Sequence, residues 1–131
     1  MPIRGAGRSG ICYSITMPLL KLLLCTASAH FGRGVSALLE RHDLSVRVCT
    51  DLADIIPILG EDLPDLVVCG WRFHHGTAFT TLQQVAREFP HVPLLVWSSS
   101  LPDEPLPWPR LAKPCRLDLA VEAFLAAARP V

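Results

Sequence analysis

The sequence has no cluster of basic residues. Lys and Arg together number 12, the same as Asp and Glu, and they are dispersed along the 131 residues. A surface that binds nucleic acid needs concentrated positive charge to displace the counterions of the phosphates, so we expect no nucleic-acid binding. Charged residues make up only 18% of the chain and hydrophobic residues 50%, which excludes an intrinsically disordered protein.

Motifs for metals, dinucleotides and catalytic serines are also missing from the contexts in which they function. The five cysteines are an odd number, they stand singly, and no CxxC pair occurs. No GxGxxG follows a predicted strand, as dinucleotide binding requires, since the one match at residues 5–10 precedes the first strand, and no GxSxG occurs around any serine. We therefore expect no enzymatic activity, no cofactor and no structural metal, and reduced thiols in a cytoplasmic setting. The cysteines are Cys12, Cys25, Cys49, Cys69 and Cys115.

No apolar run is long and uninterrupted enough to predict a membrane helix, although the N-terminus offers an alternative. Arg4 and Arg8 precede the apolar stretch 11–25, and residues 27–29 resemble a signal-peptide cleavage site. The competing interpretation is that Lys21, which interrupts the stretch, begins a core strand. We adopt the strand, with residues 1–16 as a poorly ordered extension and 17–131 as one domain.

Residues 66–69 are the most informative short run. Four apolar residues after Pro64-Asp65 are too short for a helix and are typical of a strand buried on both faces. The Gly- and His-rich segment 70–77 would then lie at the carboxyl end of that strand. Ligands of open parallel sheets bind at this edge, so segment 70–77 is a candidate site.

Strand and helix patterns alternate along the chain. Short apolar runs recur between segments with helical spacing, which predicts a parallel sheet with right-handed crossovers in a three-layer α/β domain. Thr50 or Asp51 can cap the second helix, Gly60 can end it, and Thr77 can cap the third. The predicted strands are 22–25, 45–49, 66–69 and 93–97, and the predicted helices between them are 30–41, 51–59 and 77–89.

The alternation fails at residues 101–109. This segment holds four prolines, and no helix forms at that density. We expect an extended surface loop in place of a fourth crossing helix. A brief fifth strand at 111–112 and an Ala- and Leu-rich helix at 117–128 complete the domain.

Five segments in this order resemble the receiver domains of two-component response regulators. Residues 21–40 are similar, without gaps, to the family's opening KILIVDDHPLFREGLRALLE, and 64–70 are similar to PDLVLLD. Residues 76–79 resemble GTGF, 92–99 resemble a strand ending in Thr or Ser, and 111–114 resemble YLxKP. The resemblance implies a doubly wound, five-stranded parallel sheet in the order 2-1-3-4-5 and a role in bacterial signalling and phosphorelay.

The chemistry that the resemblance implies is missing here. Receivers use an aspartate on the third strand as phosphoryl acceptor and an acidic pair after the first strand to hold Mg²⁺, which prefers carboxylate oxygens. Gly70 occupies the acceptor position, and Thr26 and Ala27 occupy the positions of the acidic pair. Glycine offers no nucleophile. The resemblance thus indicates a degenerate receiver that is not switched by phosphorylation.

Two polar positions of the implied phosphorylation site remain. Ser98 matches the hydroxyl residue and Lys113 the cation that contact a phosphoryl group. One interpretation is a vestigial pocket for an anion or acidic side chain. The other is that Ser98 merely ends a strand and that Lys113 caps backbone oxygens or points to water. Arg110 replaces the aromatic residue that reports phosphorylation in the family.

Other residues of the predicted loops could contact a partner or ligand. Cys25 and Cys69 with His74 and His75 could form a soft metal site, but their spacing matches no ligand pattern, and buried cysteines also serve as small hydrophobes. Residues 26–30 and 70–77 could also line a flavodoxin-like crevice. The remaining candidates are aromatic: Trp71, Phe73 and Trp108, which either anchor a partner or fold back over the sheet, whereas Trp97 is a predicted core residue.

Two functional hypotheses follow. The first is an atypical receiver that acts by phosphorylation-independent protein contact, with the proline segment 101–109 able to dock against a partner. The alternative is a sensor that holds a small ligand or anion in the vestigial pocket. A homodimer is also possible, because loss of the fourth helix would leave apolar sheet surface to cover.

Overall fold

The computed structural model describes residues 20–128, and the expected extension over residues 1–16 lies outside them. Strands and helices alternate as predicted. In the described part no helix is long and apolar enough to cross a membrane. The elements are β2 (Leu20–Cys25), α1 (Ala29–Glu40), β3 (Leu44–Cys49), η1 (Leu52–Asp54), α2 (Ile55–Glu61), β4 (Leu66–Cys69), β5 (Arg72–Phe73), β6 (Gly76–Thr77), α3 (Phe79–Glu88), β7 (Leu94–Ser98), β8 (Arg110–Ala112) and α4 (Leu117–Ala128).

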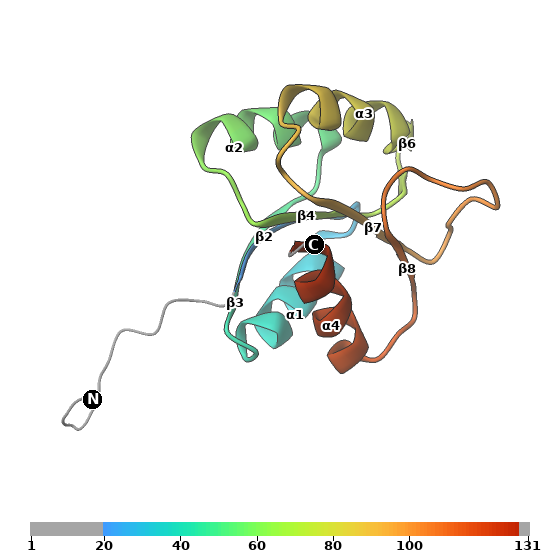
Figure 1. The fold of residues 1–131 in the computed structure, drawn as a ribbon. Coiled ribbons are helices and arrows are strands. Elements are labelled where there is room, and N and C mark those ends of the chain that lie inside the picture. Colours follow the sequence, from blue (N-terminus) through green and yellow to red (C-terminus); the bar gives the residue numbers. More distant parts are fainter. Residues whose placement is uncertain (1–19, 129–131) are drawn as a thin grey trace, which may run out of the picture.

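The main sheet has five parallel strands in the order β3-β2-β4-β7-β8, which confirms the predicted order 2-1-3-4-5. Helices α2 and α3 cover one face of the sheet, and α1 and α4 cover the other (Figure 1). The result is the predicted three-layer, doubly wound architecture. Its order reverses beside β2, and ligands of such folds bind at this kind of crossover point.

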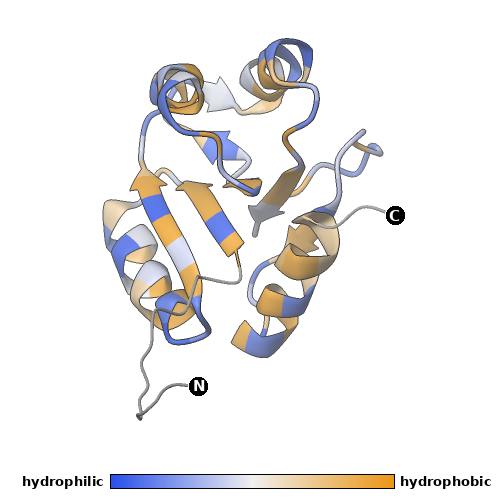
Figure 2. Ribbon diagram, turned by 60° about the vertical axis from the view of Figure 1, so that its left-hand side comes forward, coloured by the Kyte–Doolittle hydropathy of each residue, from blue (hydrophilic) through white to orange (hydrophobic). Residues whose placement is uncertain are grey.

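The core consists of two apolar layers, one on each face of the sheet. Alternate side chains of each central strand enter opposite layers: Leu23 and Cys25 face α2 and α3, whereas Leu22 and Leu24 face α1 and α4. Every residue of β4 and β7 is buried. Figure 2 shows the resulting hydrophobic strands and the mostly hydrophobic α4. Burial on both faces explains why these strands read as continuous apolar runs.

Helix α1 lies unusually close to the sheet because of Gly32. The Ser28 hydroxyl caps the helix by accepting the Phe31 backbone N–H at 3.1 Å. A Cβ placed on Gly32 would lie 2.7 Å from Cγ1 of Val48 and 3.1 Å from Cγ2 of Thr26. The helix ends at Glu40, and the predicted terminating residues His42-Asp43 form the turn that follows, with Asp43 in the left-handed region at φ 64°.

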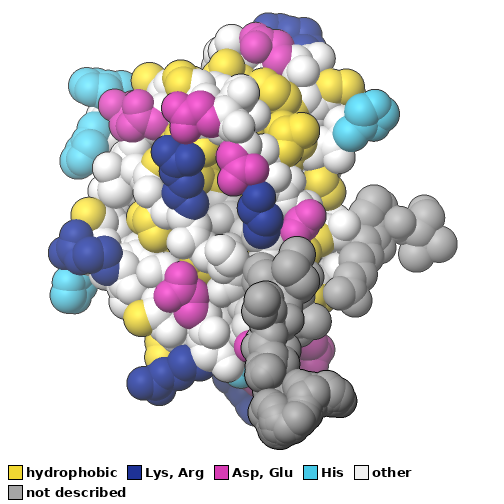
Figure 3. Space-filling view, turned by 90° about the vertical axis from the view of Figure 1, so that its left-hand side faces the viewer, with side chains coloured by type: hydrophobic (Ala, Val, Ile, Leu, Met, Phe, Trp, Pro, Cys, Tyr) yellow, Lys and Arg dark blue, Asp and Glu magenta, His cyan; other side chains and the backbone are white. Residues whose placement is uncertain are grey.

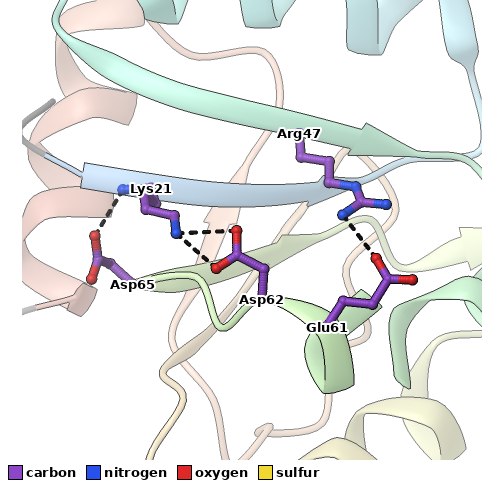
Figure 4. Close-up of polar contacts among 5 residues, drawn as sticks. All are labelled: Lys21, Arg47, Glu61, Asp62 and Asp65. Carbon is purple, nitrogen blue, oxygen red and sulfur yellow. Dashed lines mark hydrogen bonds and ion pairs between the residues drawn. The ribbon is translucent and has the colours of Figure 1, made fainter. Parts of the chain in front are cut away.

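The charged residue in β2 is accommodated at the amino end of the strand. Lys21 Nζ binds the Asp62 carboxylate at 2.9 and 3.1 Å, and the Lys21 backbone N–H donates to Oδ2 of Asp65 at 2.8 Å (Figure 4). A second exposed pair joins Arg47 and Glu61 at 3.5 Å. Figure 3 shows the side of the molecule on which β3 lies in Figure 1, where positive and negative side chains are interspersed. Exposed pairs of this kind contribute only about 0–1 kcal/mol each.

Several local predictions need correction. Segment 70–77 is not an open loop but contains a small hairpin, in which Arg72 pairs with Thr77 and Phe73 with Gly76. Thr77 is therefore a strand residue and Ala78 holds the N-cap position of α3, although Thr77 Oγ1 still accepts the backbone N–H of Phe79, the first helical residue, at 3.5 Å. Helix α2 continues past Gly60 to Glu61, after a 3₁₀ turn that Asp51 caps. Pro57 is tolerated because it lies in the first turn of α2, where backbone N–H groups lack helical partners.

The proline segment 101–109 forms an irregular loop, as predicted, and it covers the sheet in place of a helix. Leu101, Leu106 and Trp108 are partly buried and pack against the core layer on the α2 and α3 side. The loop thus supplies the apolar cover whose expected absence motivated the homodimer hypothesis.

We expect Gly32→Ala to destabilise the protein by about 1–3 kcal/mol, because the new methyl group overpacks the contact between α1 and β3. Gly34→Ala is the matched control in the same helix, since a Cβ there meets nothing within 4 Å. That variant should be stabilised by up to about 1 kcal/mol through helix propensity. Urea unfolding followed by circular dichroism measures both, and equal effects would contradict the proposed close packing.

Candidate functional site

The parallel register brings four of the predicted site positions to one edge of the sheet. Cys25 is level with Cys69, and Ser98 is level with Ala112. Backbone hydrogen bonds extend this order beyond the strands. Gly70 N–H donates to Cys25 O at 2.8 Å, and Lys113 N–H donates to Ser98 O at 3.0 Å. Four neighbouring strands therefore carry these positions at their carboxyl ends: Ser98 is the last residue of β7, and Thr26, Gly70 and Lys113 directly follow β2, β4 and β8.

An aromatic ring lies beside Gly70. A Cβ on Gly70 would be in van der Waals contact with two ring carbons of Phe73, at 3.8 and 3.9 Å, and with Cys25 O at 3.7 Å. Phe73 is held there because β5 and β6 fold the chain back after β4. The acceptor position thus lacks a nucleophile, and its immediate neighbour is a hydrophobic side chain.

The two positions of the acidic pair offer no carboxylate. Thr26 is buried, its Oγ1 accepts the Ser28 backbone N–H at 3.5 Å, and its methyl group lies beneath α1. Ala27 is exposed and has no polar side-chain atom. Within residues 20–128 no group of three or more His, Cys, Asp or Glu side chains is placed to hold a metal ion. The donor set at this edge therefore does not fit Mg²⁺, which requires oxygen ligands.

Ser98 and Lys113 both have intramolecular partners. Ser98 is buried, and its Oγ accepts the Ser100 backbone N–H at 3.0 Å. Lys113 Nζ lies 3.7 Å from the ring centroid of Phe31 and 5.0 Å from that of Trp97. Burial lowers the pKa of Lys113, an effect that Cys115 partly opposes. Neither sequence interpretation foresaw this arrangement, in which the ammonium rests on aromatic faces.

Three free cysteines lie side by side beneath this edge. Cys25 is in register with Cys49 on one neighbouring strand and with Cys69 on the other, and all three are buried. The hydrogen bond to Cys25, followed by burial, raises the pKa of the Cys49 thiol. In Cys25 the hydrogen bond to Cys49 lowers the pKa, but the hydrogen bond to Cys69 and burial outweigh it, so the net direction is upward. The raised pKa values keep Cys25 and Cys49 protonated, so they pack as small apolar groups.

A separate open cleft of about 660 Å³ lies on the α3 side of the same sheet edge. Two aromatic side chains, Trp71 and Phe79, form part of its floor and meet edge to face at 6.3 Å. Phe79 also meets Trp108 of the loop, outside the cleft lining, at 5.8 Å. Trp71 is only 7% exposed, whereas Phe79 is 37% exposed. The lining residues come from the hairpin, the start of α3 and the proline loop: Trp71, Arg72, Thr77, Phe79, Ser100, Leu101, Pro102, Asp103, Glu104, Pro105 and Leu106.

Arg110 holds the loop that forms one wall of this cleft. Its Nη1 donates to Pro102 O at 2.8 Å and to Glu104 O at 3.1 Å. Arg110, which the resemblance aligns with an aromatic residue that reports phosphorylation in receivers, is thus hydrogen-bonded to backbone carbonyl groups of its own chain. Figure 1 shows the loop between β7 and β8 projecting from the body of the domain.

The predicted partner contacts therefore have different environments. His74 and His75 form the exposed tip of the hairpin, away from the buried thiols of the sheet. Trp71 and Trp108 pack on the core, as the fold-back alternative for these aromatics requires. Sequence reasoning missed the cleft residues Phe79, Asp103 and Glu104. Asp103 and Glu104 could have been noticed as an acidic pair between two prolines. Phe79 could not, because it fits the apolar stripe of its helix.

Solved structures with a similar fold are receiver domains and related signalling proteins. A sensor protein from Polaromonas sp. JS666 shares 14% identity over 85% of this chain and 97% of its own, with a TM-score of 0.74. The non-phosphorylated HemR receiver domain from Leptospira biflexa shares 18% identity, covering 85% and 98%, with a TM-score of 0.72. The signal receiver domain of an HD domain-containing protein from Pseudomonas fluorescens Pf-5 shares 16%, covering 86% and 94%, with a TM-score of 0.73.

No protein-family model matches the chain, and no curated protein sequence is significantly similar to it. The structural similarity establishes the receiver fold, in agreement with the resemblance of the five sequence segments. In this sequence, positions 26, 27 and 70 hold Thr, Ala and Gly, so no carboxylate is present at any of the three.

We expect a favourable coupling of about 1 kcal/mol between Lys113 and Phe31, since a partly desolvated cation over an aromatic face contributes about 0.5–2 kcal/mol. Urea unfolding of Lys113→Met, Phe31→Leu and the double variant measures it as a double-mutant cycle. A second cycle that combines Lys21→Met with Phe31→Leu is the control and should be additive. Additivity in both cycles would rule out the cation–aromatic contact.

We expect the buried thiols to be unreactive in the folded protein. An aromatic disulfide reagent should modify Cys115 before Cys25, Cys49 and Cys69, with the modified sites identified by peptide mass mapping. Because the folded state retains the Cys25 and Cys49 protons above the ordinary pKa of a thiol, the free energy of unfolding should fall as pH rises past about 8.5. Rapid modification of Cys49 without unfolding would contradict both expectations.

Proposed function

We propose that this chain is an atypical receiver domain of a bacterial signal-transduction system that binds a protein partner without being phosphorylated. The observation that carries the proposal is the arrangement at Gly70. The acceptor aspartate is replaced by glycine, and the Phe73 ring lies against that glycine. A phosphoryl group has no nucleophile to bind here, and an apolar ring rather than a polar side chain borders the position.

The fold supports a signalling role. The similar solved structures are described as receiver domains or a sensor protein, and the similarity spans most of both chains. A receiver fold without its catalytic carboxylates still presents helices, loops and sheet edges to partners. Three buried free thiols in the core also fit a reducing, cytoplasmic compartment.

The small-ligand alternative has less support at the vestigial pocket. The hydroxyl groups of Thr26 and Ser98 each accept a backbone N–H, and the Lys113 ammonium rests on Phe31 and Trp97. A ligand there would have to displace these contacts before it gained its own. We therefore place function at the surface of the protein rather than at this edge.

The protein should acquire no phosphoryl group when it is incubated with an acyl-phosphate donor and Mg²⁺, as measured by intact mass. Gly70→Asp should also remain unmodified, because Thr26 and Ala27 supply no carboxylate for Mg²⁺. A functional receiver domain treated in parallel serves as the positive control. Stoichiometric phosphorylation of the wild-type protein would sink the proposal.

A further inference from the structure

The cleft between the hairpin and the proline loop has the chemistry of a peptide-binding groove. Phe79 and Trp71 line its floor, where Phe79 exposes part of its ring and contacts Trp71 edge to face, and Phe79 also packs edge to face on Trp108 of the loop. Aromatic-lined grooves of this kind accept prolines, whose flat rings pack against aromatic side chains. Phe79 also makes no contribution to the vestigial phosphorylation site.

The wall formed by the loop is acidic. Asp103 and Glu104 are exposed, and neither takes part in the ion pairs found within residues 20–128. A carboxylate beside an exposed aromatic face favours an arginine or lysine side chain, which can pair with the acid and stack on the ring. On the opposite wall, the Arg72 guanidinium can donate to the carbonyl groups of a bound backbone.

The wall formed by the proline loop is unsuited to binding a partner by strand addition. Pro102 and Pro105 line it and have no backbone N–H to donate. A polyproline II segment suits such a wall, because its backbone needs no regular ladder of hydrogen bonds. The two hydrogen bonds from Arg110 to the carbonyl groups of Pro102 and Glu104 hold the wall in place before binding, which reduces the entropy lost on association.

We propose that this cleft binds an extended, proline-rich segment of a partner protein that carries an arginine. The inference rests on the proposed function and names the surface and the chemical class of partner. A second copy of the chain is a poor occupant. Its own proline loop would bring Asp103 and Glu104 against the same two carboxylates, and like charges repel.

The probe is a terminally blocked peptide, Arg-Pro-Leu-Pro-Pro-Leu-Pro-Pro, titrated into the unmodified protein. Binding is followed by calorimetry and by the fluorescence of the protein tryptophans, since the peptide has none. One comparison peptide replaces Arg by Glu, and another replaces every Pro by Ala. We expect both replacements to weaken binding by about tenfold or more, through lost charge pairing and lost preorganisation respectively.

Matched variants test the acidic loop wall and the floor. The double variant Asp103→Asn, Glu104→Gln should lose the preference for the Arg peptide over the Glu peptide. Its control, Asp118→Asn with Glu122→Gln, removes the same charge from α4 and should keep that preference. Phe79→Ala should weaken binding about tenfold, and Leu119→Ala, an exposed apolar residue on α4, should not change it. Far-ultraviolet circular dichroism of each variant verifies the fold.

Three results would overturn the inference. These are no binding up to about 1 mM peptide, equal affinity for the proline and alanine peptides, or an undiminished preference for Arg in the Asp103 and Glu104 variant. Each leaves the proposed function standing if the protein still resists phosphorylation. Conversely, phosphorylation by the acyl-phosphate donor would refute the proposed function whether or not the peptide binds.

Discussion

Burial of the central strands on both faces is the constraint on which the rest of this structure depends. β4 and β7 have no exposed residue, so their side chains alternate between two closed apolar layers. A slip of one residue would exchange the layers and is strongly disfavoured. The fixed register sets Cys25, Cys69 and Ser98 at the carboxyl ends of their strands. The hairpin and the proline loop, which begin there, are thereby placed beside each other.

At this edge the polar groups are satisfied within the chain. A phosphorylated receiver requires carboxylates for Mg²⁺ and free hydroxyl and ammonium groups for the phosphoryl oxygens. Here the hydroxyl groups bind local backbone N–H groups, and Lys113 lies on two aromatic rings. Without an acidic centre, the half-buried Lys113 ammonium is stabilised mainly by the aromatic faces of its neighbours. The absence of carboxylates at this edge and the placement of the Lys113 ammonium on aromatic rings are thus parts of one electrostatic environment.

The sequence predicted most of the scaffold and little of the cleft. β4 and α4 match their predicted bounds because periodicity, length and flanking residues agree at those sites. The hairpin was missed, since its two-residue tip, His74-His75, lacks the usual Asn-Gly signal. The contact of Lys113 with Phe31 joins residues far apart in the chain, and no local pattern encodes it. The cleft likewise requires three segments that only the tertiary fold assembles.

The replacement of the fourth helix by a proline loop bears on how such a domain could signal. A switch needs an element with two arrangements of similar free energy that the signal can bias. The loop here contains four prolines with fixed φ angles, packs three apolar side chains on the core, and is tied to Arg110 by two hydrogen bonds. These features favour a single conformation. They support a binding surface that is always present. For this reason we propose that the domain acts through a preformed cleft and not through a phosphorylation-dependent rearrangement.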